Sequence, residues 1–146
     1  MQNIQFDSGI AEFTVNGGGV LRFNPGDPNV YARFYDATEK IQAVEQALVE
    51  KTKAEDPESA ALELIRIMEE ADRQMKDILG WVFGPGNDFD KLLEGINLLA
   101  VAANGERVIT NLFAALEPVL IEGAERCARD KTQAAVAKAK ARRGGK

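Results

Sequence analysis

Few side chains in this sequence could perform catalysis near neutral pH. The chain contains no histidine, which removes the commonest general base and the commonest metal ligand of proteins. A catalytic triad that uses histidine is therefore excluded within the sequence. The single cysteine, Cys127, lies on an apolar helical stripe between Arg126 and Arg129. This position favours a core residue, with a cation-activated thiol as the alternative, and one thiolate with carboxylates would be an unusual zinc site.

Three further groups of residues suggest chemistry but have simpler structural explanations. The glycines at 17–19 lack the helix and Gly-Lys-Ser/Thr sequence that follow a phosphate-binding loop, and they fit a hairpin turn. Residues 87–90 lack the alternating ligands and closing glutamate of a calcium loop. Asp88 and Asp90 form a potential acid–base pair, but helix capping explains Asp88 and a first helical turn suits Asp90. We therefore predict no catalytic, cofactor-binding or metal-binding residues and a protein that is not an enzyme.

Composition and length predict one folded domain of the α+β class. We expect residues 1–130 to form this domain, with an antiparallel β-meander over 1–26 and a bundle of about four to five helices over 27–130. Residues 131–146 are predicted to be a basic, frayed helix or a disordered tail. The sequence has no run of eighteen apolar residues, so no membrane-spanning helix is predicted. A single cysteine excludes an internal disulfide and is typical of a reducing cytoplasm.

The predicted meander has three short strands within residues 4–15 and 20–23. Ile4 and Phe6 alternate with polar residues, and the same alternation returns further along, which predicts one buried face. Such a meander is only marginally stable alone and needs a covering helix. Its open edges also predict weak self-association into a homo-oligomer. The side chains expected to cover it are Tyr31 and Phe34.

Helix boundaries are signalled by turn and capping residues. Asp27 followed by proline predicts the start of a helix over residues 28–53. A second aspartate–proline pair, at 56–57, predicts a helix that ends near residue 82, with one apolar stripe that runs from Ala61 through Leu64 and Met75 to Val82. The Gly-Pro-Gly at 84–86 must break that helix, and either Asn87 or Asp88 is expected to cap the short helix that follows. The apolar run over 96–103 is predicted to be buried, Asn104 and the glycine after it to form a turn, and a last helix to follow from about residue 109. Within the second helix, Glu69 with Arg73 and Asp72 with Lys76 are predicted as ion pairs on the outer face.

Charge is unevenly distributed along the chain. The whole chain has a net charge of −5. Six basic residues and no acidic residue follow Asp130, so this tail carries +6 and residues 1–130 carry −11. This acidic body disfavours nucleic acid as a principal partner, because phosphate contacts dominate such binding. The basic tail suits either a solvated helix end, where cations are favoured by the dipole, or contact with RNA or an acidic protein surface.

Three segments carry a resemblance to a known family. They are IQFDSGIAEFTVNGGGVLRF, the overlapping GVLRFNPGDPNVYARFYDATEK, and the later AVAANGERVITNLFAAL. With the acidic helical body and basic tail, they resemble the small tail assembly chaperones of long-tailed, siphovirus-like bacteriophages and prophages. The resemblance implies binding to the tape measure protein, a long and largely helical chain that is kept soluble while tube subunits polymerise around it. It also implies a location in the host cytoplasm, absence from mature virions, and the tail tube protein as a further partner.

Apolar helix faces are the predicted partner-binding surfaces. We expect the surface near Leu112 and Phe113, bordered by the loop at 84–86, to receive a helical segment of the partner. The aromatic residues around that loop either anchor it in the core or offer contacts to the partner. The alternative function is a structural virion protein, such as a minor tail or head–tail connector component. The candidate binding residues are Phe34, Ile41, Leu48, Trp81, Phe83, Phe89, Ile109, Leu112, Phe113 and Leu116.

Overall fold

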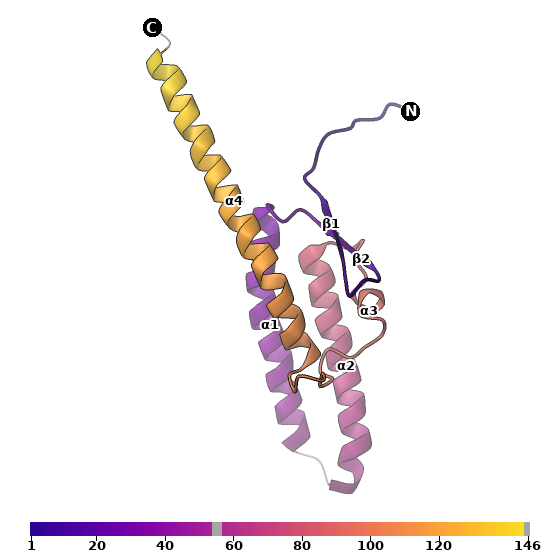
Figure 1. Ribbon diagram of the computed structural model, residues 1–146. Coiled ribbons are helices and arrows are strands. Elements are labelled where there is room, and N and C mark those ends of the chain that lie inside the picture. Colours follow the sequence, from indigo (N-terminus) through magenta and orange to yellow (C-terminus); the bar gives the residue numbers. More distant parts are fainter. Residues whose placement is uncertain (54–56, 145–146) are drawn as a thin grey trace.

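The computed structural model, which describes residues 1–53 and 57–144, combines a β-hairpin with a helical bundle (Figure 1). Helices α1 and α2 lie side by side and run antiparallel. Helix α4 packs against α1, and its C-terminal part projects away from the body. The predicted α+β class is confirmed. In chain order the elements are β1 (Ala11–Thr14), β2 (Val20–Phe23), α1 (Pro28–Lys53), α2 (Pro57–Phe83), α3 (Phe89–Leu92) and α4 (Val108–Gly144).

The hairpin pairs β1 and β2 antiparallel, with Phe13 opposite Leu21. Its turn uses positive φ angles at Asn16 and Gly17, as the right-handed twist of the strands favours. One face is buried, because Phe23 packs edge-on against Phe83 at the end of α2, with ring centroids 4.8 Å apart. The sequence predicted that Tyr31 and Phe34 of α1 would cover the hairpin, but the helix aromatic side chain that packs against Phe23 is Phe83 of α2.

The predicted first strand of the meander is wrong, because the sheet has two strands within the described residues. Ile4 and Phe6 lie on an extended segment and are 86% and 80% exposed. Gly9 has a φ of +72°, and its N–H donates to Asp7 Oδ1 over 2.8 Å. The Asn24 side chain donates to the Ser8 carbonyl over 3.0 Å. These contacts turn the chain away from β1 before a third strand can pair.

Helix α1 has the bounds that the sequence predicts. Asp27 Oδ1 accepts from the Asn29 N–H over 2.9 Å, as expected of a helix start. The α2 start predicted at Asp56 lies outside the described residues. The predicted stripe of α2 is buried only in its C-terminal half, at Ala71, Met75 and Val82, whereas Leu64 remains exposed. The core therefore runs along the contact between α1 and α2 and continues to where the hairpin, α3 and α4 meet the end of α2.

The segment between α3 and α4 is only partly buried. Leu98 and Leu99 are in the core, but Ile96 and Val101 are exposed, so the prediction of a wholly buried run over 96–103 is wrong. The predicted turn at Asn104 and the following glycine is confirmed. This turn leads into α4, which includes Pro118 and is helical in its backbone through Gly144. Fraying of the tail stays a prediction.

Candidate functional site

A groove of about 520 Å³ lies between the hairpin, α3 with its following loop, and α4. Its volume is within the range of ligand pockets in proteins. Strand alternation places Phe13 and Val15 on the same face of the hairpin, and steps of three and four place the α4 side chains on one helical face. We call it the apolar groove; it is lined by Phe13, Val15, Leu21, Phe23, Phe89, Leu92, Leu93, Ile96, Ala102, Val108, Leu112, Ala115, Leu116 and Val119, with Thr14, Asn16, Glu94 and Asn111 as its polar members.

Asn87 fixes the hairpin wall of the apolar groove. Its Oδ1 accepts from the Arg22 N–H over 2.8 Å, and its Nδ2 donates to the Arg22 carbonyl over 2.8 Å. The same Nδ2 donates to the Phe83 carbonyl over 3.0 Å. Asn87 is only 7% exposed and acts as a strand partner for β2, closing that edge of the hairpin. Sequence reasoning offered Asn87 as a helix cap and missed this role, because its partner lies 65 residues away.

Asp88, the other proposed cap, begins α3. Its side chain accepts from the backbone N–H groups of Asp90 and Lys91 over 3.1 and 3.3 Å. This is the structural role that the sequence favoured over acid–base chemistry. The cap turns α3 so that Phe89 and Leu92 face the core and line the apolar groove.

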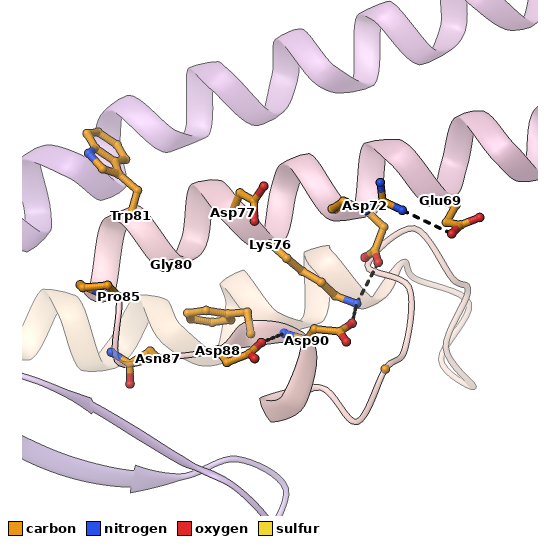
Figure 2. A pocket seen from close by; sticks show the side chains of 13 residues that line it. Glu69, Asp72, Lys76, Asp77, Gly80, Trp81, Pro85, Asn87, Asp88 and Asp90 are labelled. Carbon is orange, nitrogen blue, oxygen red and sulfur yellow. Dashed lines mark hydrogen bonds and ion pairs between the residues drawn. The ribbon is translucent and has the colours of Figure 1, made fainter.

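A second, polar pocket of about 940 Å³ lies between α2 and residues 85–90 (Figure 2). Figure 2 shows Lys76 reaching between Asp72 and Asp90. Its Nζ lies 2.8 Å from Asp72 Oδ2 and 2.6 Å from Asp90 Oδ1. Asp72 Oδ1 also accepts from the Leu98 N–H over 2.7 Å. These contacts tie α2 to α3 and to the loop that follows it.

Lys76 is a buried structural cation. Its side chain is 6% exposed. Burial by itself lowers the pKa of Lys76, but hydrogen bonds and charge attraction from Asp72 and Asp90 outweigh it and raise the pKa above its ordinary value. The prediction that the Asp72–Lys76 pair lies on the outer face is wrong, since both side chains are largely buried. The predicted pair of Glu69 and Arg73 is exposed, with Glu69 Oε1 and Arg73 Nη2 3.5 Å apart.

The ten candidate binding residues are divided among three environments. Phe89, Leu112 and Leu116 line the apolar groove. Trp81 borders the polar pocket and lies beneath Lys40, whose Nζ is 3.8 Å from the ring centroid. The other six lie away from the groove, either in the hydrophobic core or packed against that core: Phe34, Ile41, Leu48, Phe83, Ile109 and Phe113.

The structure separates Phe113 from the groove surface near Leu112. Phe113 is half-buried and packs edge-on against Phe34, with centroids 5.3 Å apart. The break between α2 and α3 borders the polar pocket through Pro85, so the prediction that this loop borders the Leu112 surface is wrong. Cys127 is half-buried on α4, with a free thiol.

Comparison with known proteins finds no matching family model, curated protein or solved structure. Among the helices of residues 1–53 and 57–144, none is both long and apolar enough to cross a bilayer. In the same ranges, no three carboxylate or thiolate side chains gather as a metal site would require.

Proposed function

We propose that this protein is a tail assembly chaperone of a long-tailed bacteriophage or prophage, and that its apolar groove binds helical segments of the tape measure protein. The groove itself is the observation that carries the proposal. It combines an aromatic wall on the hairpin with an aliphatic wall on α4, and it is large enough for side chains of an incoming helix. Amphipathic helices are commonly recognised in such grooves through residues at helical spacing.

The charge of the body supports the same function. A long helical chain that exposes apolar stripes tends to aggregate before its tube is built. A partner that covers those stripes and carries −11 over residues 1–130 would also keep the complexes apart by repulsion. Under this proposal the protein acts in the host cytoplasm, has no catalytic role, and leaves before the virion matures. The tail tube protein would be a second partner.

Co-expression with the tape measure protein of the same phage or prophage tests the proposal. The parent chain should keep the tape measure protein soluble and co-purify with it. Ala115→Glu places a charge in the groove at an exposed position and should reduce the co-purified amount about tenfold or more. Ala114→Glu is the matched control, because Ala114 is also exposed on α4 but does not line the groove.

Two results would contradict the proposal. One is a tape measure protein that stays insoluble with the parent chain, and the other is equal capture by the parent and Ala115→Glu. Purified virions provide a separate test, since a chaperone should be absent from them. Stoichiometric recovery in virions would instead support a minor tail or connector component.

A further inference from the structure

The two edges of the hairpin differ in their hydrogen bonding. Asn87 bonds to both backbone groups of Arg22 and so closes the outer edge of β2. Glu12 is the register partner of Arg22. Because the backbone groups of Arg22 point outward, those of Glu12 point outward on the opposite edge. Within the described residues no partner bonds to Glu12 there, so the edge of β1 is open.

The segment before β1 has the pattern of a strand without a sheet. Ile4 and Phe6 alternate on one side of an extended chain and are exposed. The first ten residues include a single charged side chain, Asp7, in an otherwise strongly acidic body. Figure 1 shows this segment running away from the body. The Asp7 turn and the Asn24 contact with Ser8 hold it in that direction.

The open edge and the apolar groove lie together. Phe13 and Val15 of the β1 side line the groove, and α4 forms its opposite wall. A strand added to the β1 edge would therefore place its alternate side chains over the groove. Main-chain hydrogen bonds would supply affinity and the groove would supply specificity, as in other cases of strand addition.

We propose that residues 4–6 of a second copy of this chain add to the open edge of β1, so that Ile4 and Phe6 enter the apolar groove. Each copy has both the strand and the groove, so the exchange is reciprocal and closes as a twofold dimer. The nearly uncharged segment suits this role because the acidic bodies of two copies repel each other. The inference needs only the chain itself and does not depend on the chaperone function. Because both occupants would use the apolar groove, the dimer and a complex with the tape measure protein would be alternative states of the chain.

Sedimentation velocity over a range of concentrations tests the dimer. The parent should associate reversibly, and Phe6→Asp should raise the dissociation constant of the dimer about tenfold or more. Gln5→Asp is the matched control, since it adds the same charge on the other side of the strand. A parent that stays monomeric would overturn the proposal. An equal effect of the two substitutions, or unfolding by Phe6→Asp, would also overturn it.

Cysteine cross-linking tests which groove the segment enters. In a Cys127→Ser background, one chain would have Ile4→Cys and another Ala115→Cys, an exposed groove position. Mixing the two should give a disulfide-linked heterodimer under mild oxidation, and absence of that link would refute the exchange. When one chain has both substitutions, a disulfide within a monomer would show that the segment enters its own groove, which also refutes it.

Discussion

Replacing Asn87 by alanine should loosen the hairpin from the body and damage the apolar groove. The substitution removes two hydrogen bonds to Arg22 and one to the Phe83 carbonyl. Each such bond contributes about 0.5–1.5 kcal/mol net. Arg22 itself is exposed, so water can satisfy part of what is lost there, whereas the bond to Phe83 is buried. We therefore expect the free energy of unfolding to fall by about 2–3 kcal/mol.

The expected change in melting temperature follows from the length of the chain. For a domain of this size, 1 kcal/mol corresponds to about 3–5 °C, so Asn87→Ala should melt about 10 °C below the parent. Asn29→Ala is the control, because Asn29 is exposed at the start of α1 and its loss should change stability by no more than about 0.5 kcal/mol.

Calorimetry and amide hydrogen exchange together separate a local role from a general one. The Arg22 amide should exchange much faster in Asn87→Ala, because its acceptor is removed. The reasoning would be refuted if Asn87→Ala melted within about two degrees of the parent and the Arg22 amide kept its protection.

Three other substitutions and one deletion have defined outcomes. Lys76→Met should destabilise the protein by about 3 kcal/mol in urea unfolding, because a buried carboxylate loses its cation. Because folding raises the pKa of Lys76 above 10.5, the charged side chain contributes fully to stability below pH 10.5, and this contribution is lost as the pH rises through the raised pKa. The difference in unfolding free energy between the parent and Lys76→Met should therefore shrink only above pH 10.5. Gly123→Ala should cost about 1–3 kcal/mol, since its Cβ would overlap the Pro25 carbonyl, whereas Gly80→Ala, with 3.7 Å to the nearest atom, should gain about 0.5–1 kcal/mol in thermal unfolding. Deletion of 131–146 should shift the melting temperature by no more than about two degrees, because little apolar area is present there, and a much larger drop would show that the tail packs on the body.

Local signals in the sequence predicted the parts of the fold that depend on neighbouring residues. The aspartate–proline pair at 27–28 gave the start of α1, since a cap and a proline at the first position act within one turn. The hairpin turn near Gly17 and the cap at Asp88 were predicted for the same reason. These features need only a few consecutive residues to form.

Contacts between distant segments could not be predicted in this way. Ile4 and Phe6 do alternate with polar residues, but a strand forms only where the segment can reach the edge of another strand. The turn at Gly9 directs this segment away from β1, and both side chains are exposed. Asp72 and Lys76 have the spacing of an exposed pair, but Asp90 and the Leu98 backbone approach them from segments that follow α2 in the chain. Periodicity likewise identified apolar helix faces without showing which residues line a groove and which fill the core.

Hydrogen exchange on binding a helical segment of the tape measure protein tests the central claim most directly. Overlapping peptides from that protein would be titrated into the chain, and protection would be mapped along it. We predict new protection in β1, in α3 and in α4 around Leu112 to Val119, where the apolar groove lies. Protection confined to the exposed apolar side chains near the start of α2, at Leu62 and Ile65, would contradict the assignment of the groove, and no protection with any peptide would contradict the chaperone function.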